Sequence, residues 1–243
     1  MPKLSQTRTP PDAAARVRRG YFECRYGQLH LHNAMPSGGG FEEGTALLCI
    51  QDLEGSARIF ANLLAISGCD RSVYAPDLPG FGESDPPPGP VALADYALAL
   101  GDFIDTMRLR TLAVLAVRRG VMLATELALA RPAQVSRLMM LGVPPLDPAA
   151  RRTGQDGAAD PTQPQCQAWA MQAALAYPLR ERLAKITQPL ALVRAQDEPA
   201  QTTARLRELV PTARIVDLMQ PAGELLRSPL SLGGAVREFL RVA

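Results

Sequence analysis

Histidine is nearly absent from this 243-residue sequence. The two histidines, His30 and His32, alternate within one stretch near the start of the chain, and none follows them. Histidine is the side chain whose ordinary pKa suits proton transfer near neutral pH. Any acid–base chemistry in the rest of the chain must therefore use other residue types. We expect both histidines on the surface of a strand, remote from any catalytic site.

Paired metal-binding cysteines are also missing. The four cysteines are widely separated, and no two of them form a C-x-x-C pair: Cys24, Cys49, Cys69 and Cys166. A zinc site of Cys and His ligands needs such spacing. We expect no metal site and no cofactor.

Long apolar runs and strong net charge are absent as well. No segment approaches the roughly 20 apolar residues of a membrane span, and residues 1–20 contain four arginines but no apolar core of a secretory signal. A net charge of +2 gives no reason to expect a nucleic acid or membrane partner. We therefore expect a cytoplasmic protein. With only two lysines against many arginines, alanines and prolines, the composition is typical of a GC-rich bacterial genome.

What is present fits one globular domain. Hydrophobic residues make up 47% and charged residues 21% of a chain long enough for a large core. We expect a flexible N-terminal tail over 1–20 and a single domain over 21–243. Within that domain, strand-like and helix-like segments alternate. Predicted strands are 21–25, 28–34, 46–50, 72–75, 112–116, 135–141, 190–194 and 214–218, and the last helix is predicted at 233–242.

Apolar strands separated by amphipathic helices predict an α/β protein with a mostly parallel sheet of about eight strands, covered by helices on both faces. Residues 144–187 interrupt the alternation. Their first part, 147–164, is rich in Ala, Pro, Asp and Gly, which predicts an irregular loop, and 165–177 is predicted to be helical around the single tryptophan, Trp169.

Two motifs carry a family resemblance. Residues 112–132 read LAVLAVRRGVMLATELALARP, a strand, a sharp turn and a helix, and 74–85 read YAPDLPGFGESD. Both resemble the α/β-hydrolase superfamily, the first its nucleophile elbow G-x-S-x-G and the second a glycine-rich loop that is structural in the family. The resemblance implies the α/β-hydrolase fold, with 144–187 as a short cap. In the elbow, however, Arg118 stands where the family has its nucleophile, and a guanidinium cannot attack a carbonyl.

The family's oxyanion loop is altered too. Its usual His-Gly pair corresponds here to Gln51 and Asp52, followed by Leu53. By the resemblance, the oxyanion donors would be the backbone amides of Leu53 and Arg119. Added carboxylates there would oppose a developing negative charge.

The remaining triad positions are occupied by two carboxylates. Asp197 stands at the family's acid position and Glu224 at its histidine position. If the family geometry holds, Arg118, Asp197 and Glu224 converge, and we expect Arg118 to form an ion pair with Glu224 or with Asp197. We also expect the elbow to lose its backbone strain, since no nucleophile has to be raised there.

These replacements leave three functions open. The first is a catalytically degenerate protein that binds a small molecule or a partner, with Arg118, Glu224 and Trp169 as candidate ligand-binding residues and a carboxylate-bearing compound as the ligand that a guanidinium suits. The second is a non-hydrolytic lyase, isomerase or cyclase that uses Arg118 as an anchor and Glu224 or Asp197 as a base. The third is a non-catalytic subunit, in a homodimer or paired with an active hydrolase.

Overall fold

The computed structural model describes residues 14–37, 45–153, 164–198 and 200–241. Their strands form one eight-stranded sheet in the order β1-β2-β4-β3-β5-β6-β7-β8. Only the β1–β2 and β2–β4 pairs are antiparallel. The strands are β1 (Arg18–Cys24), β2 (Gly27–Ala34), β3 (Ala46–Ile50), β4 (Val73–Pro76), β5 (Leu112–Val117), β6 (Val135–Leu141), β7 (Leu190–Arg194) and β8 (Arg214–Asp217). The predicted mostly parallel sheet is confirmed.

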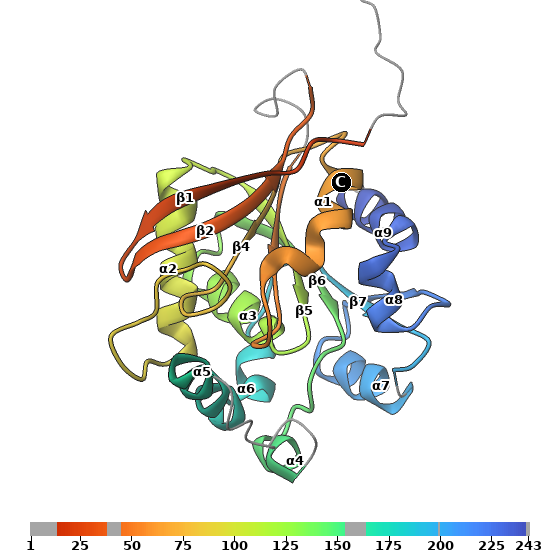
Figure 1. The fold of residues 1–243 in the computed structure, drawn as a ribbon. Helices are drawn as coiled ribbons and strands as arrows, with labels where there is room; N and C mark the ends of the chain where they lie inside the picture. Colours follow the sequence, from red (N-terminus) through yellow and green to blue (C-terminus); the bar gives the residue numbers. More distant parts are fainter. Residues whose placement is uncertain (1–13, 38–44, 154–163, 199, 242–243) are drawn as a thin grey trace, which may run out of the picture.

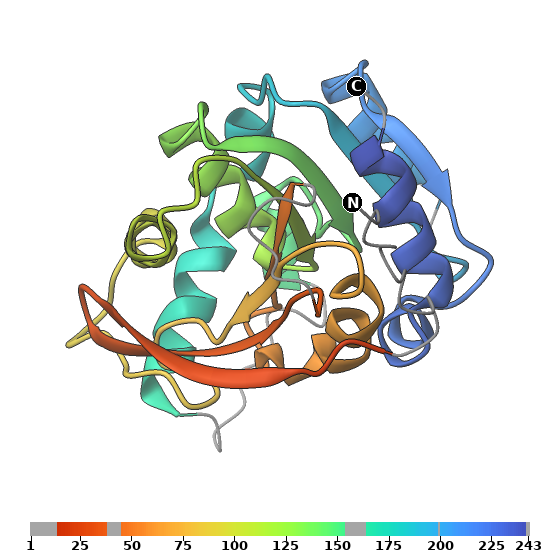
Figure 2. The same ribbon diagram turned by 90° about the horizontal axis from the view of Figure 1, so that it is seen from above.

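Helices cover both faces of this sheet (Figures 1 and 2). They are η1 (Ala57–Phe60), α1 (Ala61–Ser67), α2 (Leu93–Thr106), α3 (Gly120–Ala130), α4 (Pro148–Thr153), α5 (Gln165–Ala176), α6 (Leu179–Leu183), α7 (Ala200–Leu209), α8 (Ala222–Arg227) and α9 (Leu230–Arg241). One core cluster joins the sheet to α2, α3, α5, α6 and α7. The other joins the opposite face to η1, α1, α8 and α9. Both clusters are possible because every residue of the central strand β5 is buried, so that alternate side chains enter alternate cores.

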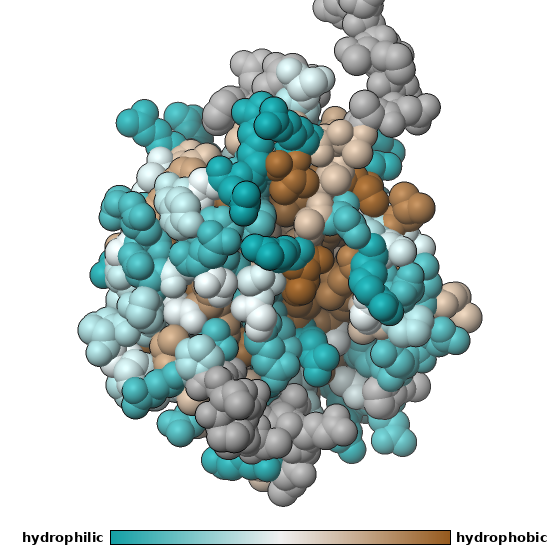
Figure 3. Space-filling model, in the orientation of Figure 1, coloured by the Kyte–Doolittle hydropathy of each residue, from teal (hydrophilic) through white to brown (hydrophobic). Residues whose placement is uncertain are grey.

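Polar residues cover most of the face seen in Figure 3, and apolar residues gather near its middle, beside α1. No described helix is long and apolar enough to cross a membrane.

The N-terminal boundary predicted at residue 20 is wrong within the described region. β1 begins at Arg18, which pairs with Asn33 of β2, and the amide of Ala15 donates to the carbonyl of Ala65 at 2.8 Å. Arg18, Arg19 and Gly20 show no apolar strand pattern in the sequence, and they form a strand through backbone pairing with β2. Residues 1–13 of the predicted tail lie outside the described region.

The chain between β6 and β7 contains α4, α5 and α6. The helix expected over 165–177 is present as α5, whereas α4 occupies part of the stretch predicted to be irregular, of which 154–163 are not described. α8 and the early start of α9 at Leu230 were also missed. α4 and α8 have six residues each, too few to show a helical repeat in the sequence.

The surface position predicted for His30 and His32 is wrong. Both are buried, because β2 is an inner strand between β1 and β4 and the side chains from Leu29 to Ala34 are all covered.

Candidate functional site

A sharp turn joins β5 to α3 at the carboxyl edge of the sheet. Arg118 lies in this turn with φ at +49°, the left-handed region that few residues other than glycine adopt. Its amide donates to the carbonyl of Leu141 at 2.8 Å, and its carbonyl accepts from the amide of Val121 at 3.1 Å. The expected loss of strain is therefore wrong: the elbow is retained without a nucleophile.

The neighbouring loop explains why the turn is kept. A Cβ atom on Gly120 would lie 2.2 Å from the carbonyl oxygen of Gln51, so the loop after β3 passes directly against the start of α3. This close approach of two backbones requires glycine at 120 and involves no side-chain atom of residue 118. Packing of the scaffold, and not chemistry, maintains the strained residue.

The Arg118 side chain does not meet the carboxylates expected to pair with it. Its Nε lies 3.1 Å from Oδ2 of Asp52, and 63% of the side chain is exposed. Among the ion pairs of the described residues, none joins Arg118 to Asp197 or Glu224. Asp197 instead accepts a hydrogen bond from the amide of Ala222 at 2.9 Å, and Glu224 pairs with Arg227 of its own helix at 3.1 Å. The predicted partner was wrong because the loop after β3 brings a nearer carboxylate.

Asp52 accepts hydrogen bonds from two backbone amides beside the elbow. Its Oδ1 accepts hydrogen bonds from the amide of Leu53 at 2.8 Å and from the amide of Arg119 at 3.2 Å. These are the two amides that the resemblance assigns as oxyanion donors. The Asp52 carboxylate thus accepts from both of these amides. By the resemblance, its negative charge lies where the oxygen of a substrate would become negatively charged during hydrolysis.

Arg119 holds this carboxylate in place. Its Nε donates to Asp52 Oδ1 at 2.7 Å and its Nη2 to Asp52 Oδ2 at 2.8 Å, while Nη2 also lies 2.8 Å from Oε1 of Glu54. Only 3% of the Arg119 side chain is exposed. Burial alone would lower the pKa of this guanidinium, but the two carboxylates outweigh it and raise the pKa, so the group stays charged.

Helix α5 contacts this arrangement at the carboxyl edge of the sheet (Figure 1). Nη1 of Arg119 lies 3.1 Å from the sulfur of Met171, and Gln167 Nε2 donates to the carbonyl of Gly80 at 3.3 Å. Trp169, on the same helix, is half-buried. Gln51 is fully buried beneath the loop, with Nε2 donating to the carbonyl of Gly55 at 3.3 Å.

Sequence reasoning missed Glu198, the neighbour of Asp197. Burial raises the pKa of its carboxyl group to about 7, and its Oε2 is buried with no hydrogen-bond partner among the described residues. The sequence carries no signal for this, because it does not show which of two neighbouring carboxylates after β7 turns inward.

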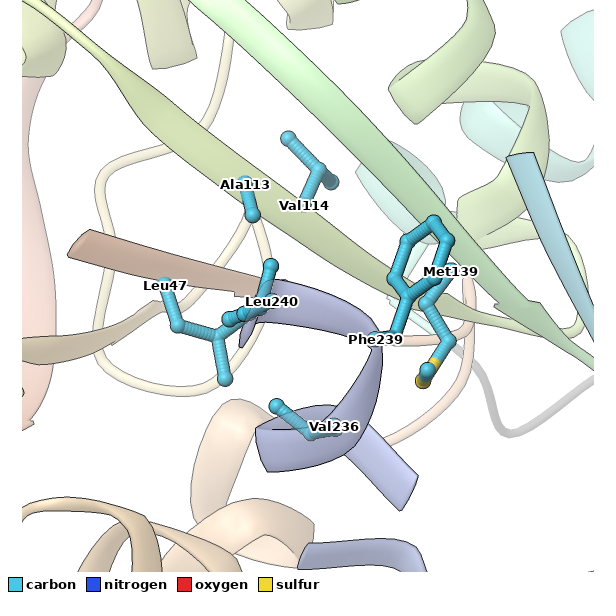
Figure 4. A pocket seen from close by; sticks show the side chains of 7 residues that line it. All are labelled: Leu47, Ala113, Val114, Met139, Val236, Phe239 and Leu240. Carbon is cyan, nitrogen blue, oxygen red and sulfur yellow. The ribbon is translucent and has the colours of Figure 1, made fainter. Parts of the chain in front are cut away.

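Two cavities lie away from the elbow. A void of about 10 Å³ between the sheet and α9 is lined by apolar side chains, as Figure 4 shows, and has room for about one water molecule. A wide groove of about 710 Å³ follows α7 and β8 and is lined in part by Arg194, Thr203 and Asp217. Neither includes Arg118, Asp52 or Arg119.

Comparison with known protein families agrees with this geometry. The model of the α/β hydrolase fold family matches residues 45–200, which include the oxyanion loop, the glycine-rich loop, the elbow and Asp197. The chain belongs to the α/β-hydrolase fold family. No curated protein matches the sequence.

Solved structures with this fold include enzymes of several kinds. The enol-lactonase from Burkholderia xenovorans is 17% identical with a TM-score of 0.75, over 91% of this chain and 99% of the enzyme. A thioesterase domain from the curacin biosynthetic pathway is 15% identical with a TM-score of 0.72, over 91% and 99% of the two chains. A haloalkane dehalogenase variant from Bradyrhizobium elkanii is 16% identical with a TM-score of 0.70, over 93% and 96%. Identities this low show a shared fold and leave the chemistry of this chain open.

Proposed function

We propose that this α/β-hydrolase fold protein has a binding role and does not hydrolyse esters through a serine triad. The observation that carries the proposal is the Asp52 carboxylate in the oxyanion position, with both backbone donors bonded to it. Arg118 and Glu224 also replace the attacking and proton-transferring groups. In a well-studied serine protease, removing the triad costs on the order of 10⁶ in turnover. In such variants the oxyanion donors still stabilise the transition state to some extent, whereas here Asp52 occupies the corresponding donors.

The ligand that fits this site best is a small carboxylate. Asp52 is bound at both oxygens by the buried Arg119, which leaves Arg118 as the exposed cation of the elbow. Apart from its contact with Asp52, the Arg118 guanidinium has no hydrogen-bond acceptor among the described residues. A planar guanidinium with two available terminal nitrogens suits a two-point contact with a carboxylate. Trp169 and Glu224 remain candidate contacts for the rest of the ligand.

Two measurements test this proposal. Purified protein should hydrolyse p-nitrophenyl acetate no faster than buffer and should resist labelling by an organophosphonate. In thermal-shift titrations with a panel of small carboxylates, at least one compound should raise the melting temperature of the wild type but not of Arg118→Gln. Arg58→Gln is the matched control, since Arg58 is 67% exposed and also contacts one carboxylate, Glu83. Esterase activity that the phosphonate blocks would overturn the proposal, and equal shifts for both variants would remove Arg118 from the site.

A second candidate, a non-hydrolytic enzyme, gains one specific support from Glu198. A general base works best with a pKa near the operating pH, and among the described carboxyl groups the pKa of Glu198 is the one raised to about 7. Asp197 and Glu224, the bases expected from sequence, are engaged with Ala222 and Arg227. Turnover of a bound ligand, lost in Glu198→Gln, would favour this function over binding alone. A non-catalytic subunit role predicts instead a partner chain in native mass spectrometry.

A further inference from the structure

Strand β2 places two imidazoles on the same side of the sheet. His30 and His32 are two residues apart on one strand, so their side chains point to the same face. Their rings meet edge to face, with centroids 4.7 Å apart. Asp77 follows β4, the antiparallel neighbour of β2, and its amide donates to the carbonyl of His30 at 2.9 Å. Asp77 is thus the cross-strand neighbour of His30.

The three side chains form one buried cluster. A potential ligand atom of each lies within 4.8 Å of those of the other two. Nδ1 of His30 is 2.8 Å from Oδ2 of Asp77, and both side chains are 1% exposed. His32 is 6% exposed. Two imidazoles and a carboxylate are typical ligands of zinc.

The imidazole of His32 contacts the cluster through its ring, which packs against that of His30. Neither of its ring nitrogens hydrogen-bonds to any residue in the described part of the chain. An imidazole nitrogen that makes no hydrogen bond within the protein is available as a metal ligand, and a ring nitrogen of His32 lies within 4.8 Å of a ligand atom of His30 and of Asp77.

Asp77 is held firmly in position by backbone donors. Its Oδ1 accepts from the amide of Ala57 at 2.6 Å, and its Oδ2 accepts from the amide of Glu83 at 3.1 Å. The chain wraps closely around this carboxylate, since a Cβ atom on Gly82 would lie 2.1 Å from Oδ2. Hydrogen bonds of this kind orient a carboxylate ligand before a metal arrives.

We propose that His30, His32 and Asp77 bind a divalent transition-metal ion of the zinc type. Zinc lies about 2.0–2.2 Å from nitrogen and oxygen ligands, which places tetrahedral ligand atoms roughly 3.3 Å apart. Atoms already within 4.8 Å of one another reach this spacing through small side-chain movements. Glu83 lies beside the cluster: its Oε2 is 4.0 Å from Nε2 of His30 and accepts a hydrogen bond from the hydroxyl of Tyr21 at 2.9 Å.

The bound ion would cross-link two parts of the chain. It would join the N-terminal hairpin to the glycine-rich loop, two parts of the chain that otherwise meet here through the His30–Asp77 contact and neighbouring hydrogen bonds. Binding to the folded state alone stabilises it. We therefore expect zinc to raise the melting temperature without changing any property of the Arg118 site.

The test is metal binding by the full chain, expressed without a polyhistidine tag and treated with a chelator. Zinc titrated in competition with a fluorescent zinc indicator should bind at one site per chain, whereas Mg²⁺, which prefers oxygen ligands, should not compete. His32→Gln should bind zinc at least tenfold more weakly, because even partners outside the ligand set affect affinity by about 10–100-fold. Cys69→Ser, which removes an exposed thiol, is the control and should bind like the wild type.

Cobalt provides a second measurement that needs no variant. Co²⁺ in the site should give visible absorption bands of a nitrogen- and oxygen-ligated ion, without the near-ultraviolet band of a thiolate ligand. The proposal is overturned if wild type takes up no zinc in the competition, if folded His32→Gln binds it as tightly, or if the cobalt spectrum shows a thiolate.

Discussion

The carboxylate of Asp52 and the guanidinium of Arg119 form a buried two-point ion pair, with N–O distances of 2.7 and 2.8 Å. Both residues also belong to the oxyanion position, since the amide of Arg119 is one of its two donors. Under the proposed function, the carboxylate that neutralises the buried Arg119 also occupies the two amides that a substrate oxygen would need.

Breaking this pair should strongly destabilise the fold. Asp52→Ala leaves Arg119 charged and buried, and we expect the free energy of unfolding to fall by about 3–5 kcal/mol. Urea denaturation measures it. Replacing both residues, as Asp52→Ala with Arg119→Met, should recover part of the loss, because no buried charge is then left unpaired and the remaining Arg118 and Glu54 side chains are exposed to water. Glu54→Gln is the control: Glu54 is 58% exposed, and its contact with Arg119 should contribute less than about 1 kcal/mol.

Rebuilding the triad alone should not restore hydrolysis. Arg118→Ser with Glu224→His supplies the two missing residue types but leaves Asp52 bonded to both oxyanion donors. We expect p-nitrophenyl acetate hydrolysis to stay at background in this double variant. Adding Asp52→Gly and Arg119→Met should free the donors and give the first measurable rate. A double variant as active as the fourfold one would show that Asp52 does not block the site.

Two arginines of the described residues, Arg108 and Arg118, have a left-handed backbone conformation. Replacing each with glycine distinguishes the cost of backbone strain from the contribution of the side-chain contacts. Arg108 has φ at +53° at the end of α2, where glycine is favoured, so Arg108→Gly should raise the free energy of unfolding by roughly 0.5–1 kcal/mol. Arg118→Gly relieves the same strain but loses the contact with Asp52, and we expect a change closer to zero. Chemical denaturation of both variants gives the comparison. A loss above about 2 kcal/mol for Arg118→Gly would mean that its side chain stabilises the elbow.

The contact between the elbow and the oxyanion loop should depend on Gly120. In Gly120→Ala the new Cβ would lie 2.2 Å from a backbone oxygen, which the chain can relieve only by moving β3's loop or α3. We expect a loss of roughly 1–3 kcal/mol, the range for overpacked sites. Gly234→Ala, in α9 with open space around its Cβ, should instead stabilise by up to about 1 kcal/mol. Equal changes in melting temperature for Gly120→Ala and Gly234→Ala would contradict the close contact at Gly120.

Glu198 should make stability depend on pH in the direction opposite to most carboxylates. Its pKa is raised from 4.5 to about 7 in the folded chain, so between these values the folded state binds a proton that the unfolded state lacks. The contribution of protonated Glu198 to the free energy of unfolding is fully present below about pH 4.5, and it is lost as the pH rises to about 7. Glu198→Gln should therefore be more stable than wild type at pH 8, by at most roughly 3 kcal/mol, with the difference vanishing near pH 4.5. Urea titrations at the two pH values measure it, and a constant difference would contradict the shifted pKa.

Local patterns in the sequence were sufficient for the fold. Apolar runs such as 112–117 with helices between them predict a parallel sheet, because strand and helix periodicity are properties of neighbouring residues. The same holds for the elbow position of Arg118 and for the absence of histidine after His32, from which the proposed loss of triad chemistry was predicted without any coordinates. Short elements such as α8 were not predicted, because a helix of about one and a half turns is too short to show the helical repeat of apolar residues.

Only the tertiary structure decided which charged groups meet. Arg118 pairs with Asp52, 66 positions away, and not with Glu224, because the loop after β3 lies closer to the elbow than α8 does. His30 is buried against Asp77 because an inner strand, β2, lies beside β4. Glu198 and not Asp197 turns inward after β7. Which ion pair forms depends on differences of a few ångströms in the distance between charged groups on segments far apart in the chain. Over such distances, two charged groups either contact each other or are separated by water. Residue types determine which contacts are possible, and the packing of the sheet and its loops selects among them.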